Sequence, residues 1–268
     1  MKIGIIGYGS MGKMLLHKFS NNCKLNKEDL LISNRTIEKL KEVGNISTIL
    51  DNKELSKKAD IVFLCIRPVD FKNVLEEIKD VINPNSLLVS LNGSISFDSI
   101  HKMINNKLTK VIPSVTAEID KSQTLVCFED NINEEYKITL KKLLLSFGEV
   151  IELPEDEMGM GSELVSCMPG FIAAIFDTLC NKAKEHTTIP NDEIIKMVEN
   201  TITSTIELMI KNDMTFNDVV SRVATKGGIT EEGTKVIYEL LRKVANDIFV
   251  KTLEIRKLTK ENEEKELN

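Results

Sequence analysis

The feature that most constrains this chain is a glycine pattern near its start. Gly7-Tyr8-Gly9-Ser10-Met11-Gly12 directly follows an apolar run, Ile3–Ile6, and leads into a stretch with helical spacing. A G-x-G-x-x-G at a strand-to-helix turn makes the turn tight, lets the backbone approach a pyrophosphate and allows the helix to pack closely on the strand. The helix start adds unpaired N–H groups and a partial positive charge. The pattern therefore predicts a dinucleotide-binding turn rather than a turn that serves packing alone.

Short apolar runs alternate with helix-like segments in the first half of the chain. The strand-like runs are residues 3–6, 30–33, 61–66, 87–91, 110–112, 125–128 and 149–153. They are apolar throughout, which indicates a parallel sheet with helices on both faces. After Pro154 apolar residues recur at helical spacing, and we expect helices near 157–185, 191–212, 215–224 and 230–260 before a frayed, solvated end over 260–268. The sequence predicts an α/β protein with a doubly wound Rossmann domain, residues 1–154, and an all-helical domain, residues 155–268.

Composition excludes several classes of function. The formal net charge of −6 disfavours nucleic acid or an acidic membrane as a partner, because no basic field would gather phosphates. The five cysteines include no C-x-x-C pair and no histidines cluster, so neither a disulfide framework nor a metal site is indicated. No run of about 18 apolar residues occurs, and no cleavage site follows the first apolar stretch. We therefore expect a cytoplasmic protein.

The end of the second strand-like run bears on the choice of nucleotide. Enzymes that use NAD commonly place an acid there, which accepts a hydrogen bond from the ribose 2′-hydroxyl. This chain has Ser33-Asn34-Arg35-Thr36 instead, and Asp29 precedes the run. An arginine with small polar neighbours suits a 2′-phosphate, so we predict NADP(H) over NAD(H). The alternative for Arg35 is a solvated residue at a helix start.

Two later loops follow strand-like runs and should open on the same edge of the sheet, where ligands of open α/β sheets bind. They are Ile66-Arg67-Pro68 and Asn92-Gly93. Pro68 suits a first helical turn, and Gly93 allows the backbone to approach a ribose or nicotinamide. A cofactor role and an ordinary loop role are equally open for both loops.

One segment of the helical half combines glycines with hydroxyl groups. Thr225-Lys226-Gly227-Gly228-Ile229-Thr230 places two glycines beside a helix start, where backbone N–H groups lack helical partners. The amides of Gly227 and Gly228, with the hydroxyls of Thr225 and Thr230, would form a nest for a small carboxylate. The structural alternative is that Thr230 is simply the N-cap of the last helix.

Together these segments resemble the pyrroline-5-carboxylate reductases over nearly the whole chain. The glycine turn, the 33–35 corner, the 59–68 strand and the 225–233 loop stand in the family's order and spacing. The resemblance implies NADPH-dependent reduction of the cyclic imine 1-pyrroline-5-carboxylate to L-proline, by a homodimer or a ring of dimers assembled through the C-terminal helices. It also implies that Thr230 is the catalytic residue and hydrogen-bonds the imine nitrogen, while Thr225, Gly227 and Gly228 hold the substrate carboxylate.

Three departures from the family pattern surround the expected site. Ser114 stands where the family usually has an asparagine near the nicotinamide, and it is included among the predicted cofactor residues. Cys167-Met168 replaces a Ser-Gly pair, and Lys226 replaces a proline in the carboxylate loop. These variants occur together in the late-competence reductase-like proteins of Gram-positive bacteria, a divergent branch that the chain resembles.

Two other functions stand beside the imine reductase. Substrate drifts more readily than fold or cofactor, so a slow or non-catalytic NADP-binding paralogue with a regulatory role is the alternative. A dehydrogenase of acyl or hydroxy-acid substrates is disfavoured, because no lysine or histidine falls where a general acid would be needed. Cys167 is either a buried small hydrophobe or part of the pocket.

Overall fold

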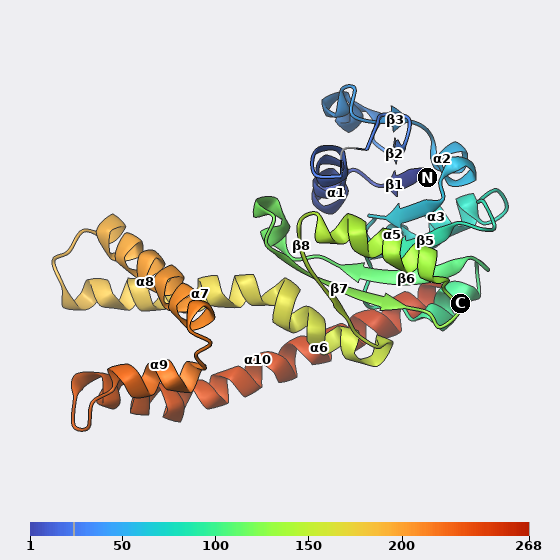
Figure 1. The fold of residues 1–268 in the computed structure, drawn as a ribbon. Helices are drawn as coiled ribbons and strands as arrows, with labels where there is room; N and C mark the ends of the chain where they lie inside the picture. Colours follow the sequence, from blue (N-terminus) through green and yellow to red (C-terminus); the bar gives the residue numbers. More distant parts are fainter. Residues whose placement is uncertain (24, 268) are drawn as a thin grey trace. The chain divides into compact units, whose positions relative to one another are not determined.

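The computed structural model describes residues 1–23 and 25–267, in which strands and helices alternate through the first half of the chain (Figure 1). The strands are β1 (Ile3–Ile6), β2 (Leu30–Ser33), β3 (Thr48–Ile49), β4 (Ile61–Leu64), β5 (Leu87–Ser90), β6 (Lys107–Ile112), β7 (Ser122–Phe128) and β8 (Gly148–Glu152). The helices between them are α1 (Ser10–Asn21), α2 (Asn52–Lys58), α3 (Pro68–Ile78), α4 (Phe97–His101) and α5 (Glu134–Leu145), with short 3-10 segments at η1 (Ile37–Val43) and η2 (Val115–Ile119).

The strands form a sheet in the order β3-β2-β1-β4-β5-β6-β7-β8. Neighbouring strands are parallel except for β6 and β7. A parallel connection needs a crossover of about a dozen residues or more. Residues 113–121 are too few for one and hold only η2, so β7 returns antiparallel. The predicted Rossmann sheet is confirmed, with this departure from a purely parallel arrangement; β3 is too short to leave an apolar run in the sequence.

Hydrophobic cores lie on both faces of the sheet. On one face Phe19 of α1 and Leu144 of α5 pack with alternate strand residues such as Ile5. On the other face Phe71 of α3 belongs to a second core that includes Ile6. Adjacent residues of β1 therefore face opposite cores, which explains why its sequence is apolar without alternation.

The chain divides into two compact units. The first comprises Met1–Pro169 together with Leu253–Asn268, and the second comprises Gly170–Thr252. The predicted limit between residues 154 and 155 marks the change from strands to helices and stays a prediction.

A helical run follows the sheet. It consists of η3 (Glu155–Glu157), α6 (Met158–Ser162), a π-helical turn η4 (Glu163–Cys167), α7 (Met168–Ala183) and η5 (Lys184–His186). Pro169 has no N–H to donate to the carbonyl four residues earlier, and the widened turn lies just before it. Helices α8 (Asn191–Lys211), α9 (Phe216–Val223) and α10 (Ile229–Leu267) complete the chain, so the predicted helical second half is confirmed.

The C-terminal end differs from the sequence-based expectation. Residues 260–268 were expected to be frayed, but α10 continues to Leu267, and Asn268 lies outside the described residues. The side chain of Glu264 accepts a hydrogen bond from Ser96, and Glu263 is only 7% exposed. Glu263 and Glu264 are therefore packed on the loop after β5, while Lys260, Glu261 and Lys265 stay exposed.

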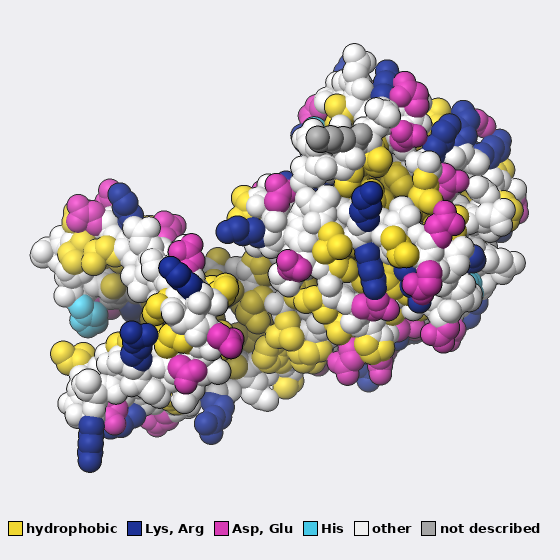
Figure 2. All heavy atoms as spheres, in the orientation of Figure 1, with side chains coloured by type: hydrophobic (Ala, Val, Ile, Leu, Met, Phe, Trp, Pro, Cys, Tyr) yellow, Lys and Arg dark blue, Asp and Glu magenta, His cyan; other side chains and the backbone are white. Residues whose placement is uncertain are grey.

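The run Glu155–His186 also differs from the expectation that no segment could span a membrane. Within the described part of the chain, it is the helix long and apolar enough to do so by length and composition. Isolated polar residues interrupt it, so a search for an unbroken apolar run misses it. Little of its apolar stretch is buried within the chain. Apolar side chains likewise reach the surface on the helices of the second unit, among lysines and acids (Figure 2).

Candidate functional site

The strands β1, β2, β4, β5 and β6 run parallel and end at one edge of the sheet. The loops that follow them carry the predicted cofactor residues, which are the 7–12 turn, the 33–36 corner, the 66–68 loop, Asn92-Gly93 and Ser114. Folding thus brings five segments that are distant in the sequence to the same edge. The predicted substrate residues 225–230 belong to the second unit.

The glycines of the turn have different surroundings. Gly7 has a φ of +103°, and a Cβ there would lie 2.3 Å from the carbonyl oxygen of Cys65. A Cβ on Gly12 would lie 1.9 Å from the carbonyl oxygen of Gly7. Among the described residues, nothing lies within 4 Å of the corresponding position at Gly9. Packing of the turn therefore requires Gly7 and Gly12, whereas Gly9 leaves open space at the helix start.

Helix α1 begins without a side-chain cap. Its N-cap is Gly9, and within the described chain no side chain caps the first turn and no acid stands in it. Ser10 and Met11 are exposed. The unpaired N–H groups and the positive end of the helix dipole make this turn suited to a phosphate.

Tyr8 connects the turn to the end of β2. Its backbone N–H donates to Asn34 Oδ1 over 2.9 Å, and Asn34 Nδ2 donates to the carbonyl oxygen of Thr36 over 2.8 Å. The Tyr8 ring is buried in the core beneath α1, and burial raises the pKa of its hydroxyl. Tyr8 therefore contributes its backbone, not its side chain, to the edge of the sheet.

Two arginines from different strand ends share one carboxylate. Arg35 Nη1 lies 2.8 Å from Asp70 Oδ1, and Arg67 Nε lies 3.0 Å from Asp70 Oδ2. The hydrogen bond from Arg67, reinforced by the charge of Arg35, holds the pKa of Asp70 below its usual value. The arginine side chains are 77% and 68% exposed, so both guanidinium groups keep donors for an incoming phosphate.

Ser33 and Thr36, the other two residues of the 33–36 corner to be placed, differ in burial. Ser33 is buried, and its hydroxyl donates to Asn52 Oδ1 over 2.7 Å, while Asn52 Nδ2 donates to Glu77. Thr36 is exposed. The Ser33 hydroxyl thus points between β2 and α2 and orders the corner from within.

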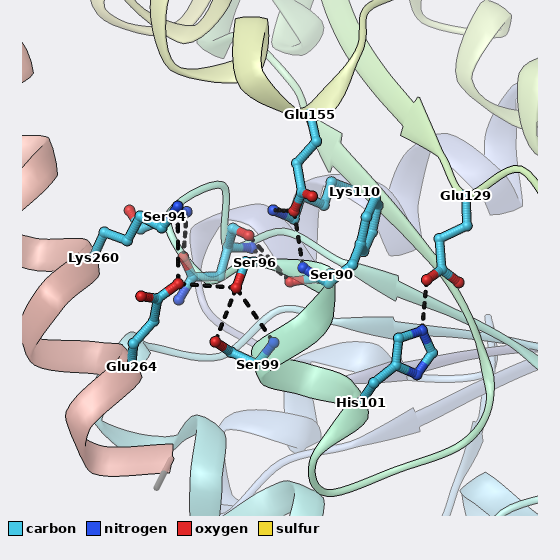
Figure 3. Close-up of polar contacts among 12 residues, drawn as sticks. Ser90, Ser94, Ser96, Ser99, His101, Lys110, Glu129, Glu155, Lys260 and Glu264 are labelled. Carbon is cyan, nitrogen blue, oxygen red and sulfur yellow. Dashed lines mark hydrogen bonds and ion pairs between the residues drawn. The ribbon is translucent and has the colours of Figure 1, made fainter.

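The loop after β5 is supported by the end of α10. Asn92 Nδ2 donates to Glu263 Oε2 over 3.3 Å, and Ser96 Oγ donates to Glu264 Oε1 over 2.9 Å. Figure 3 shows Ser94, Ser96 and Ser99 beside Glu264. A Cβ on Gly93 would lie 2.6 Å from the side chain of Ile112, so this loop packs tightly on β6.

A buried cation lies close to this loop. Lys110 of β6 is 2% exposed, and its Nζ lies 2.5 Å from Glu155 Oε1 and 4.9 Å from the centre of the Phe97 ring (Figure 3). Glu155 also accepts the backbone N–H of Phe97 over 2.8 Å. The ion pair therefore attaches the start of the helical run to the sheet. Ser114 is buried and caps η2, with its N–H donating to Ser122 Oγ.

The predicted substrate loop is folded on itself. The Gly228 N–H donates to the carbonyl oxygen of Thr225 over 2.8 Å, and the Gly227 N–H donates to Glu231 Oε2 over 2.6 Å. Helix α10 begins at Ile229, so Thr230 lies inside the first turn and is not its N-cap, contrary to the structural alternative. The Thr230 side chain is exposed and, within the described residues, its hydroxyl has no hydrogen-bond partner. The hydroxyl is therefore accessible from the surface of the loop.

A buried ion pair adjoins Cys167. Glu163 is 1% exposed and accepts from Arg256 through Nε at 3.1 Å and Nη2 at 2.7 Å. Burial, with the neighbouring Glu163 adding to it, raises the pKa of the Cys167 thiol. A thiol in this environment stays protonated at neutral pH and is a poor nucleophile. Cys167 is partly buried.

Three residues that contact the predicted site were not among the residues predicted from the sequence. Asp70 carried a signal, because an acid three residues after Arg67 at a helix start favours an ion pair with it. Glu231 stands at the third position of α10, where an acid commonly turns back to the amides before the helix. Glu263 carried none, because its partner Asn92 is distant in the sequence.

Comparison with known proteins gives two family matches. The family described as NADP oxidoreductase, coenzyme F420-dependent, matches residues 2–93. The family described as pyrroline-5-carboxylate reductase dimerisation matches residues 155–257. The two matches cover most of the sheet's predicted nucleotide edge and most of the helical half.

Individual proteins match over almost the full length. Pyrroline-5-carboxylate reductase 3 of Bacillus subtilis (strain 168) is 30% identical over 94% of each chain, and the ComE operon protein 4 of the same strain is 24% identical over 94% of each. A crystal structure of Plasmodium falciparum pyrroline carboxylate reductase with NADP bound has the same fold, with a TM-score of 0.81, 21% identity and coverage of 100% of this chain and 98% of that one. The extent of these matches shows that the chain belongs to the pyrroline-5-carboxylate reductase family.

Proposed function

We propose that this protein catalyses the NADPH-dependent reduction of 1-pyrroline-5-carboxylate to L-proline, as a cytoplasmic enzyme of proline biosynthesis. The observation that carries the proposal is the 30% identity to a pyrroline-5-carboxylate reductase over 94% of both chains. The uncapped glycine turn and the paired arginines support it, because this geometry suits a dinucleotide with a 2′-phosphate.

The described residues fit NADPH at the edge of the sheet. The amides of Gly9, Ser10 and Met11 would hold the pyrophosphate in the open space above Gly9. Arg35 and Arg67 would hold the 2′-phosphate, while Asp70 keeps the two guanidinium groups together. The loops at 66–68 and 92–93 and Ser114 would line the ribose and nicotinamide. Bound NADPH supplies the hydride for the carbon of the C=N bond.

The loop at the start of α10 would hold the imino acid. The exposed Thr230 hydroxyl would hydrogen-bond the ring nitrogen, which gains a proton as the adjacent carbon is reduced. Thr225 and the amides of Gly227 and Gly228 would bind the carboxylate, in exchange for the hydrogen bonds that the two amides make to Glu231 and to the carbonyl oxygen of Thr225. Fixing the ring at both ends orients the C=N bond, and such positioning supplies much of the rate in a reaction between two bound molecules.

We also propose a homodimer, or a ring of dimers, formed through the C-terminal helices. The family match at 155–257 supports it, as do exposed apolar side chains on α10, which include Ile237, Leu240 and Val244 at 51%, 61% and 48% exposure. A second copy, rather than a membrane, would cover the apolar run 155–186. The net charge of −6 argues against nucleic acid as a partner.

The test is to follow NADPH oxidation with synthetic pyrroline-5-carboxylate while titrating NADPH binding separately. Clear turnover is expected, together with binding. Nucleotide binding with turnover at background would contradict the enzymatic proposal and favour the regulatory paralogue. Absence of binding to either pyridine nucleotide would contradict both.

A further inference from the structure

We propose that Glu231 is a specificity-determining residue that competes with the substrate's carboxylate for the loop at the start of α10. The inference rests on the proposed function, and it concerns affinity for the substrate rather than the chemistry of reduction. The Glu231 carboxylate already accepts a hydrogen bond from an N–H group that the substrate carboxylate would also need. Glu231 Oε2 accepts the Gly227 N–H over 2.6 Å.

The two glycine amides of the loop have different partners. The Gly228 N–H is engaged by the carbonyl oxygen of Thr225, and a Cβ on Gly228 would lie 2.5 Å from Thr225 Oγ1, so this part of the loop is closely packed. Gly227, in contrast, has a φ of +72° and open space around its Cβ position among the described residues. Of the two glycine amides, the Gly227 N–H is therefore the one held by a side chain rather than by the backbone, and that side chain is Glu231.

Glu231 can leave this position. Its side chain is 34% exposed, and its Oε2 lies 3.9 Å from Lys235 Nζ on the next turn of α10. Released from Gly227, the carboxylate can move toward this ammonium group, which already pairs with Glu232 at 2.6 Å. An incoming carboxylate must therefore displace Glu231 from the Gly227 N–H, and it is then repelled by the negative charge of Glu231 nearby. Both effects weaken binding of an anionic substrate.

A purely structural role makes a different prediction. An acid at the third helical position commonly caps the amides that precede the helix. If Glu231 only caps, its removal lowers stability and loosens the loop, so that carboxylate binding weakens or stays unchanged. If it competes, its removal strengthens binding.

The variants are Glu231→Ala, Glu231→Gln and, as the matched control, Glu239→Ala, which removes an exposed acid further along the same helix. Glu232 is left unchanged because it pairs with Lys235, the neighbour of Glu231. Each full-length protein is titrated with tetrahydrofuran-2-carboxylate in the presence of NADP⁺, and KM for pyrroline-5-carboxylate and for NADPH is measured. We expect Glu231→Ala to lower both the Kd of the probe and the KM of the imino acid about fivefold to tenfold, as loss of a charged competing hydrogen bond implies. KM for NADPH should stay at its wild-type value in every variant, and Glu239→Ala should leave the Kd of the probe and the KM of the imino acid unchanged.

Glu231→Gln keeps an acceptor and so preserves the cap, but it lacks the charge, and we expect a smaller gain. It also provides the test if the alanine variant does not fold. No gain in probe affinity for either variant overturns the inference, whether or not the wild-type protein binds the probe measurably. Failure of the proposed function is seen separately, as absent turnover with the imino acid in a protein whose probe affinity still responds to residue 231.

Discussion

At the edge of the sheet, one acidic residue pairs with two basic residues. Asp70 accepts from Arg35 and Arg67, which follow different strands, and so brings two exposed guanidinium groups to one place. Two cations against one carboxylate leave a net positive charge beside the uncapped end of α1. This local field exists in a chain whose overall charge is negative, so an anion would be attracted to the corner and not to the surface in general.

We predict that Arg35→Ala lowers kcat/KM for NADPH about tenfold, because a charge-assisted hydrogen bond to a phosphate is worth about 1.5 kcal/mol or more. Steady-state kinetics with both nucleotides should show no matching loss with NADH, which has no 2′-phosphate. Lys39→Ala is the control, since Lys39 is an exposed cation of η1 that is not paired with Asp70. An equal loss with NADPH and NADH would assign Arg35 to the general order of the corner instead.

The C-terminal end of α10 packs on the loop that follows β5. Residues 253–267 belong to the first unit, whereas the start of the same helix belongs to the second. Glu263 and Glu264 contact the loop after β5, in which Asn92 and Gly93 are predicted cofactor residues. This segment is rich in charge, a composition typical of frayed ends, yet tertiary partners order it.

We predict that Glu264→Ala lowers the free energy of unfolding by about 1 kcal/mol, because Ser96 loses its acceptor. In a thermal melt this corresponds to a decrease in Tm of roughly 2 °C for a protein of this size. Glu261→Ala serves as the control, since this exposed acid on the same helix should change stability by less than about 0.5 kcal/mol. Equal melting temperatures for the two variants would show that the contact with Ser96 contributes nothing to stability.

In the assembled protein the second unit matters for its surface, because α10 exposes a row of apolar side chains. Ile237, Leu240, Leu241 and Val244 recur at helical spacing on α10 and are all exposed. Large contiguous apolar patches on soluble proteins mark surfaces that another molecule covers. The match of this region to a dimerisation family points to a second copy of the chain.

We predict that Leu240→Glu converts the dimer to a monomer at micromolar concentration, measured by light scattering, because a charge buried in an apolar interface is strongly unfavourable. Arg242→Glu introduces the same acid two residues away, on the opposite side of the helix, and should remain dimeric. A wild-type protein that is monomeric in the same measurement would contradict the proposed assembly.

Local patterns in the sequence were sufficient to predict much of the architecture. Apolar runs predicted most strands, because a strand buried on both faces needs no alternation, and helical spacing predicted α8 and α9 to within a residue or two. The glycine turn was predicted from its spacing and from its place between a strand and a helix. The clash that excludes a Cβ at Gly12 arises within this unit, whereas the clash at Gly7 involves the carbonyl oxygen of Cys65, which is distant in the sequence. The functions assigned to these residues stay predictions.

The Rossmann fold class, the glycine turn and the helical second half could be predicted from the sequence, because apolar runs, glycine spacing and helical periodicity are patterns between near neighbours along the chain. The folded chain was needed to show that Asp70 joins Arg67 to the distant Arg35 and that Glu264 of the charged C-terminal segment meets Ser96. Those contacts depend on which distant segments meet at the sheet edge. That meeting is set by packing of both cores, and no local pattern encodes it.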